Sequence, residues 1–299
     1  MIYFREAEKY NLSRVDLFIP QGVTVGVIGA SGAGKTTLLK LVCGLLVCEH
    51  GMVRTMGRDP VRDRKILTAH LRAYFSELNY FQRDDTVKSQ LILMEKLYRL
   101  DRKQCREELE RLDARFRFSG FIHQKAGRLS TGQRRRVELA AVLMGSVELL
   151  LLDEPTNGMD EQGKRAFWEE ISRKKEAGTT ILLSSHNMTE IGQVCDRILL
   201  LEKGNVCYYG DRQGLLCRYA PVNQIDIQFG GAIPDMDDLP LLRYSIEQDR
   251  LHLSYNTNHI TAAEITKRIL EQTRVIQIRV TQHDLADIVR LAAEADGHP

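Results

Sequence analysis

The chain lacks the features of a membrane-spanning, secreted or nucleic-acid-binding protein. No stretch reaches the roughly 18 consecutive apolar residues of a transmembrane helix, and the opening MIYFREAEKY has no apolar core of signal-peptide length. The 42 Lys and Arg nearly balance the 40 Asp and Glu, leaving a net charge of +2, which argues against nucleic-acid binding. We expect a cytoplasmic protein that acts at a membrane only through a partner.

Metal-ligand spacing and repeats are also missing. None of the six cysteines stands in paired metal-ligand spacing, and four lie in apolar or helical stretches, which predicts reduced thiols. The sequence contains no internal repeat and no low-complexity segment. A chain of 299 residues, 43% of them hydrophobic, is long enough for one large globular domain and one small one.

The first two thirds of the chain show the pattern of an α/β domain with a helical insertion. Short apolar runs bounded by polar residues indicate strands that are covered on both faces, and residues 84 to about 141 are mainly helical in pattern. A further helix is expected at 161–178, with Gly178 as its C-cap. The predicted strands lie at residues 2–7, 14–20, 23–29, 148–155, 179–186 and 197–204.

The pattern changes at about residue 219. We place a linker near Pro221 and predict a small α+β domain over residues 219–299, after a larger α/β domain over residues 1–218. Strand, hairpin, helix, strand and helix are predicted in this small domain at residues 223–229, 243–255, 261–272, 274–280 and 284–295.

The segment GASGAGKTT matches the phosphate-loop pattern G-x-x-x-x-G-K-[ST]. A predicted strand precedes it and a helical pattern follows, the context in which backbone N–H groups surround phosphates. We expect Lys35 to reach the β- and γ-phosphates and the Thr36 hydroxyl to bind Mg²⁺. The predicted nucleotide-binding residues are Gly29, Ala30, Ser31, Gly32, Ala33, Gly34, Lys35, Thr36 and Thr37.

Polar residues at two predicted strand ends add catalytic groups. Asp153 and Glu154 follow the run LLLL, near the sheet edge where α/β folds bind ligands. We expect Asp153 to orient Mg²⁺ and Glu154 to act as general base on the attacking water. His186 ends the next predicted strand, where it could hydrogen-bond a γ-phosphate, and a structural role is the alternative.

A second segment, LSTGQ at residues 129–133, opens a helix in a way that suits an anion, although the chain already has a phosphate loop. In order, the phosphate loop, LSTGQ, LLLLDEP, NGMD and SSH resemble the ATP-binding cassette of ABC transporters, over residues 2–210. The resemblance implies a phosphate-loop NTPase fold with a mixed sheet core, an antiparallel β subdomain and a helical subdomain at about 84–145. It also implies an ATPase that binds ATP and Mg²⁺.

In that family two cassettes face head to tail, and each ATP lies between one phosphate loop and the other cassette's signature turn. The resemblance therefore implies that Ser130, Gly132 and Gln133 of the signature turn, residues 129–133, contact the partner's nucleotide. A helix start with unsatisfied N–H groups is consistent with this role. Asp160 of NGMD is implied at the dimer interface. A separate transmembrane permease subunit is the other implied partner, which would hold the chain at the cytoplasmic side of the cell membrane.

Two positions depart from the family pattern. Thr131 replaces the first glycine of the usual L-S-G-G-Q. In the family a loop glutamine precedes a Thr-Val helix start, and counting back from Thr86 puts Glu77 at the position of that glutamine. Gln82 is the alternative, and it requires the alignment to shift by five residues. A carboxylate at position 77 could bind Mg²⁺ while repelling the γ-phosphate, so Glu77 is included among the nucleotide-binding and metal-binding residues.

The adenine-stacking residue and the C-terminal domain complete the predictions. Phe4 is preferred over Tyr3 and Tyr10 for stacking, and a core position is an equal alternative for each ring.

Residues 219–299 resemble the tail domain of antibiotic, sodium and lipo-oligosaccharide exporter ATPases, which implies a regulatory or dimer-stabilising module, with an inert packing domain as the alternative. We therefore expect the ATP-hydrolysing subunit of an ABC exporter. A non-transport ABC ATPase and an importer ATPase are the alternatives.

Overall fold

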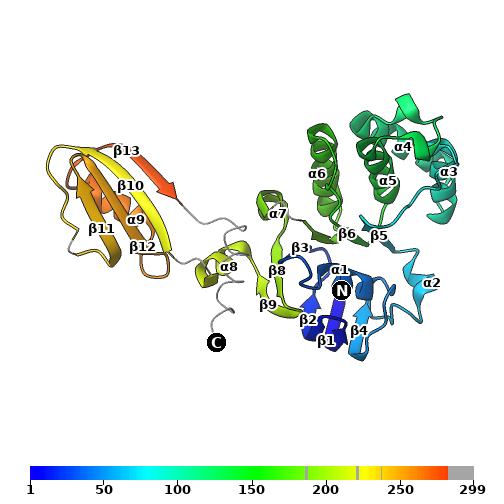
Figure 1. The fold of residues 1–299 in the computed structure, drawn as a ribbon, viewed down its shortest axis with the longest axis horizontal. Coiled ribbons are helices and arrows are strands. Elements are labelled where there is room, and N and C mark those ends of the chain that lie inside the picture. Colours follow the sequence, from blue (N-terminus) through cyan, green and yellow to red (C-terminus); the bar gives the residue numbers. More distant parts are fainter. Residues whose placement is uncertain (186–187, 220–221, 237, 282–299) are drawn as a thin grey trace. The chain divides into compact units, whose positions relative to one another are not determined.

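The computed structural model describes residues 1–185, 188–219, 222–236 and 238–281. The chain forms two compact units, Met1–Tyr209 and Gly210–Pro299, and each is described by itself (Figure 1). Helix α8 (Arg212–Tyr219) falls in the second unit, whereas the sequence pattern assigned residues 212–218 to the larger domain.

A six-stranded sheet forms the centre of the first unit and confirms the predicted α/β class. Its strand order is β5-β6-β7-β3-β8-β9, and the pairs from β5 to β8 are parallel. Every residue of β3, β6 and β7 is buried, as their uninterrupted apolar runs predict for strands covered on both faces. The strands are β3 (Thr24–Ile28), β5 (Leu71–Phe75), β6 (Leu149–Asp153), β7 (Thr180–Ser184), β8 (Arg197–Glu202) and β9 (Asn205–Gly210).

A three-stranded antiparallel sheet, in the order β2-β1-β4, shares a core with the first sheet. One cluster of buried side chains joins Phe4 of β1, Leu38 of α1 and Leu182 of β7. Strand β4 was not predicted because HGMVRT buries only Val53 and Thr55 and has no apolar run. The elements are β1 (Ile2–Lys9), β2 (Leu12–Ile19), β4 (His50–Thr55) and α1 (Lys35–Val42).

The helical insertion is confirmed, and its helices begin at side-chain caps. Thr86, Asp101 and Ser130 each accept a hydrogen bond from a backbone N–H of the first turn, which satisfies a donor that has no partner within the helix. Gly178 follows α6 with φ of +80°, in agreement with its predicted place at the helix end. The helices of the insertion are α3 (Val87–Leu97), α4 (Arg102–Phe116) and α5 (Thr131–Leu143). The other helices of the first unit are α2 (Arg64–Leu67), α6 (Glu161–Glu176) and α7 (Met188–Val194).

The second unit contains an antiparallel sheet in the order β11-β12-β10-β13. Helix α9 packs on it through Ile265 and Ile269, which share a core with Ile225 and Leu251. The predicted strand, hairpin, helix and strand are thereby confirmed, and the predicted helix at 284–295 lies outside the described residues. The elements are β10 (Val222–Gly230), β11 (Leu241–Glu247), β12 (Arg250–Asn256), α9 (Ala262–Leu270) and β13 (Arg274–Thr281).

Within residues 1–185, 188–219, 222–236 and 238–281, no helix is both long enough and apolar enough to cross a bilayer. All six cysteines are free thiols, as predicted, although only Cys105 is fully buried.

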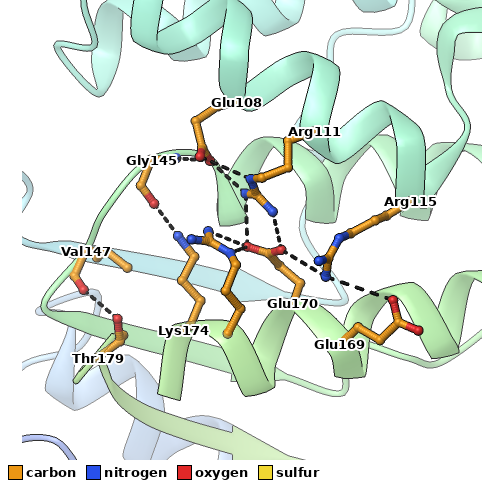
Figure 2. Close-up of polar contacts among 10 residues, drawn as sticks. Glu108, Arg111, Arg115, Gly145, Val147, Glu169, Glu170, Lys174 and Thr179 are labelled. Atoms are coloured by element: carbon orange, nitrogen blue, oxygen red, sulfur yellow. Dashed lines mark hydrogen bonds and ion pairs between the residues drawn. The ribbon is translucent and has the colours of Figure 1, made fainter. Parts of the chain in front are cut away.

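A cluster of ion pairs joins α4 to α6 (Figure 2). The buried carboxylate of Glu170 accepts hydrogen bonds from Arg111 of α4, 3.1 Å between Nη2 and Oε1, and from Arg173 of α6, 2.6 Å. Lys174 donates to the carbonyl of Gly145 at the edge of this cluster. Burial alone would raise the pKa of Glu170, but the hydrogen bonds and charges of Arg173 and Arg111 outweigh it and lower that pKa.

The Glu170→Gln variant should therefore lower the free energy of unfolding by about 3 kcal/mol, because it leaves the half-buried guanidinium groups of Arg111 and Arg173 without their buried anion. Because the folded pKa lies below the ordinary value of 4.5, the ionised carboxylate stabilises the fold above that pH and the benefit is lost as the pH falls through the folded pKa. Urea denaturation at pH 7 and at pH 4 measures both effects.

Glu169→Gln is the matched control, because Glu169 is 49% exposed and lies 3.9 Å from Arg115. It should cost less than about 1 kcal/mol. Equal losses from the two variants would show that the cluster does not stabilise the fold.

Candidate functional site

The phosphate loop, residues 29–37, follows β3 and turns sharply into α1. Gly32 and Gly34 have φ of +80° and +105°, values that favour glycine. A Cβ on Gly34 would lie 2.5 Å from Cδ2 of Leu12, and a Cβ on Gly29 would lie 2.2 Å from the carbonyl oxygen of Leu201. The glycines of the motif are therefore required by the path of the backbone.

The ammonium group of Lys35 is held against this loop. Its Nζ donates hydrogen bonds to the carbonyls of Gly29, at 2.8 Å, and Ala30, at 3.0 Å. Burial lowers the pKa of Lys35, and the charges of Glu154 and Asp153 oppose that shift. The two carboxylates therefore favour the positive charge of the amine, at the place where an anion in the loop would meet it.

Asp153, the last residue of β6, connects several elements of the site. The hydroxyl of Thr36 donates to its Oδ2 at 2.8 Å, and the hydroxyl of Ser184 donates to its Oδ1 at 2.6 Å. The N–H of Ser76 donates to its backbone carbonyl at 3.3 Å. Glu154 follows with φ of +49°, which is uncommon outside glycine, and its N–H donates to the Ser184 hydroxyl at 3.1 Å.

A hollow lies over the loop, and it is lined by six of the nine predicted loop residues and by both carboxylates, but not by Gly29, Ala30 or Ala33. The hydroxyl of Thr36 and the carboxylate of Asp153 are hard oxygen donors, and Mg²⁺ usually takes only one or two protein ligands besides phosphate and water. The pair therefore fits this ion, and the described residues hold no cluster of three or more His, Cys, Asp or Glu that would bind a metal alone. The lining residues are Asn11, Ser31, Gly32, Gly34, Lys35, Thr36, Thr37, Asp153 and Glu154.

The signature turn does not line this hollow. Its Ser130 hydroxyl accepts a hydrogen bond from the N–H of Gln133 at 3.2 Å, and Oε1 of Gln133 accepts one from the N–H of Ser130 at 3.0 Å. This reciprocal pair is a capping box that fixes the start of α5. Gly132, between the two residues, has only the carbonyl of Gly158 near its missing Cβ, at 3.7 Å.

The signature turn lies beside the segment 157–160. A Cβ on Gly158 would lie 3.7 Å from the methyl group of Thr131, and Arg136 of α5 forms an ion pair with Asp160. Asp160 is the N-cap of α6 and accepts a hydrogen bond from the N–H of Gly163 at 2.9 Å. The two segments implied at a dimer interface are thus held together, away from the chain's own phosphate loop.

Glu77 follows β5 and forms an ion pair with Lys40 of α1. Its side chain is 55% exposed and does not line the hollow. The backbone just before it is fixed, because Ser76 donates to Asp153 and accepts a hydrogen bond from Arg135 at 2.6 Å. Gln82, the alternative position for a loop glutamine, is exposed.

The preference for Phe4 as the adenine-stacking residue is wrong. Phe4 has no exposed surface and packs in the core between the sheets, so its ring cannot offer a face to a base. Tyr10 is 70% exposed, against 38% for Tyr3. Tyr10 also precedes Asn11, whose side-chain amide donates to the carbonyl of Gly32 in the phosphate loop.

Sequence reasoning missed two residues that the structure brings to the site. From the segment SSH it selected His186, which lies outside the described residues, and it passed over Ser184. A hydroxyl at the end of a strand next to that of Asp153 was the available signal. Asn11 carried no signal, because its contact with Gly32 depends on how the β1–β2 turn meets the loop.

The comparisons with known proteins agree with these motifs. The family model described as ABC transporter matches residues 12–157. The chain is 33% identical to the ABC transporter ATP-binding protein NatA of Bacillus subtilis over 202 residues, 67% of this chain and 82% of that protein. It is 30% identical to the daunorubicin resistance ATP-binding protein DrrA3 of Streptomyces coeruleorubidus over 256 residues, 84% of this chain and 79% of that protein. A match of that length extends into the second unit.

A solved structure shares the fold of the first unit. It is the dimeric post-hydrolysis state of the ATP-binding cassette MJ0796 bound to ADP and Pi. The TM-score is 0.63 at 23% identity, over 71% of this chain and 98% of that one. This similarity supports the predicted cassette fold.

Ser184→Ala should lower the rate of nucleotide hydrolysis about tenfold, as is usual when a group that orients a metal ligand is removed. The reason is that Asp153 and the backbone of Glu154 both lose a hydrogen bond. Steady-state phosphate release at saturating Mg-ATP measures the effect.

Thr179→Val is the matched control for this substitution. Thr179 precedes the same strand at its other end, and its buried hydroxyl donates only to the carbonyl of Val147 among the hydrogen bonds described. This variant should keep the wild-type rate. An equal loss of rate in both variants would mean that the effect comes from general destabilisation of β7.

Proposed function

This chain belongs to the ATP-binding subunits of ABC transporters, and on that premise we propose that it powers export through a separate membrane subunit. The observation that carries the proposal is the phosphate loop facing Asp153 and Glu154 across one hollow. As a family member the chain is an ATPase, and the site contains an anion-binding loop, a metal-ligand pair and a general base.

We propose the following division of labour for ATP hydrolysis. The N–H groups of the loop and the ammonium of Lys35 bind the β- and γ-phosphates. Thr36 and Asp153 would hold Mg²⁺, which when bound would neutralise charge on the phosphates. Glu154 takes a proton from the attacking water, and His186 hydrogen-bonds the γ-phosphate. Ser184 holds the carboxylate of Asp153 and the backbone of Glu154 in place.

The signature turn is proposed to serve a second cassette. Its capped helix start lies outside the chain's own nucleotide hollow, so Ser130, Gly132 and Gln133 are available to a nucleotide bound by a partner. Asp160, beside this turn, is proposed to contact the same partner. The MJ0796 cassette, which shares the fold of the first unit, is a dimer in its solved structure, and this agrees with a head-to-tail arrangement of two cassettes.

Export and membrane attachment are proposed from the relatives and the tail domain. The alignment with DrrA3, named for daunorubicin resistance, extends past residue 209. We therefore propose that residues 219–299 form an accessory module that regulates or stabilises the cassette dimer. The chain is proposed to bind a permease at the cytoplasmic side of the membrane, and Tyr10 is proposed to stack on adenine.

Glu154→Gln should bind ATP but hydrolyse it at least about a hundredfold more slowly, because the general base is lost. ATP would then hold two cassettes together, and light scattering after size exclusion with Mg-ATP should give twice the monomer mass. Glu154→Gln combined with Gly132→Asp is the control, since a charged side chain in the signature turn should prevent the dimer. A persistent monomer of Glu154→Gln at saturating Mg-ATP would exclude self-pairing.

The membrane partner is tested by isolating the tagged chain from gently solubilised membranes of its own cell. We expect a polytopic membrane protein in a fixed ratio to the cassette. A variant with Lys35→Met should retain that protein, because docking does not require hydrolysis. Recovery with ribosomes or assembly proteins in place of a membrane subunit would contradict the exporter role and leave the ATPase chemistry intact.

A further inference from the structure

Lys40 and Glu77 form an ion pair close to the nucleotide site that none of the five motifs includes. Lys40 lies in α1 four residues after Thr36, so the two side chains share a helix face about one turn apart. Nζ of Lys40 contacts Oε1 of Glu77. Lys40 therefore ties the carboxylate of Glu77 to the helix that carries the hydroxyl proposed to bind Mg²⁺.

The loop that carries Glu77 is anchored on both sides. On one side Ser76 donates to the carbonyl of Asp153 and accepts from Arg135. On the other side the hydroxyl of Tyr80 accepts a hydrogen bond from the N–H of Phe75 at 2.7 Å and donates to the carbonyl of Ala73 at 3.1 Å. Glu77 thus sits on a short turn fixed to the same strand end as Asp153, and its backbone has little freedom to move away.

A carboxylate at this place repels a triphosphate unless a positive charge accompanies it. A neutral glutamine, usual in the family at the position that Glu77 takes, would have no such effect. Lys40 supplies this positive charge. Its ammonium nitrogen also lies 5.8 Å from the centre of the Phe75 ring, and the face of an aromatic ring attracts cations. With 23% of its side chain exposed, Lys40 is more confined than a free surface lysine.

We propose that Lys40 is a positioning residue of the nucleotide site that neutralises Glu77 and holds its carboxylate on the α1 side of the loop. The inference rests on the proposed function, because it takes the turn at residue 77 to lie near the γ-phosphate. It assigns to Lys40 a role that exists only because residue 77 is an acid. Lys40 and Glu77 together then replace the neutral side chain that is usual in the family.

A double-mutant cycle tests this pairing through nucleotide binding. The affinity of wild type, Lys40→Met, Glu77→Gln and the double variant for a fluorescent N-methylanthraniloyl ATP is measured in EDTA and again with Mg²⁺. In EDTA, Lys40→Met should weaken binding about fivefold, the size expected for one unpaired charge near the phosphates. The double variant should bind within about twofold of wild type, since no unpaired carboxylate remains.

The metal dependence separates this role from a structural one. With Mg²⁺ the penalty of Lys40→Met should shrink, because the cation compensates the exposed carboxylate. Lys40→Arg should restore the wild-type affinity in both conditions. Lys175→Met is the matched control, because it breaks an ion pair of similar exposure, with Asp196 at 2.6 Å. Asp196 accepts a hydrogen bond from the N–H of Thr24 at the other end of β3, so this control should leave the affinity unchanged.

Two results would overturn the inference. One is an equal loss from Lys40→Met in the wild-type background and in the Glu77→Gln background, which would mean that Lys40 acts on the nucleotide or the fold by itself. The other is no loss in EDTA from either Lys40→Met or Lys40→Gln, two variants that remove the same charge with different side chains. A wild-type chain that binds no ATP would instead overturn the proposed function and this inference together.

Discussion

The carboxylate of Asp153 is the point on which the nucleotide site depends. It receives the hydroxyls of Thr36 and Ser184, while its backbone carbonyl receives the N–H of Ser76. The register of the sheet brings this about, because Asp153 pairs with Phe75 of β5 and with Ser184 of β7. Three neighbouring parallel strands therefore end at one level, and the residues that follow them meet at one edge.

Only those residues of this site whose signals are local along the chain could be predicted from the sequence. The phosphate loop and the acidic pair were evident because their signals are local, in spacing and in buried apolar runs. The roles of Ser184 and Lys40 were not, because they depend on strand order and on the side of α1 that faces the turn at Glu77. The preference for Phe4 was a different error. Side chains alternate between the two faces of a strand, so in the segment IYF the ring of Phe4 lies on the same buried face as Ile2, and Tyr3 lies on the exposed face.

Two ion pairs link the helical region to α6 of the first unit. Arg136 connects the signature helix to the N-cap of α6, and Glu170 connects the middle of α6 to Arg111 of α4 (Figure 2). Hydrogen-bonded ion pairs are directional, so they fix orientation where apolar packing would tolerate sliding. The start of α5 and the segment 157–160 are consequently expected to move as one body when a second cassette approaches.

An acid in place of the family's loop glutamine need not mark a defective site. The cost of a carboxylate near a triphosphate comes from its uncompensated charge, and in this chain the nearest helix turn supplies a cation. The residues proposed to hold the metal keep their hydrogen bonds regardless of that pair, since Thr36 and Ser184 both donate to Asp153 and not to Glu77. If the turn at residue 77 lies near the γ-phosphate as proposed, an acid there that is neutralised by Lys40 is compatible with the hydrogen bonds around Asp153 and with the proposed hydrolytic site.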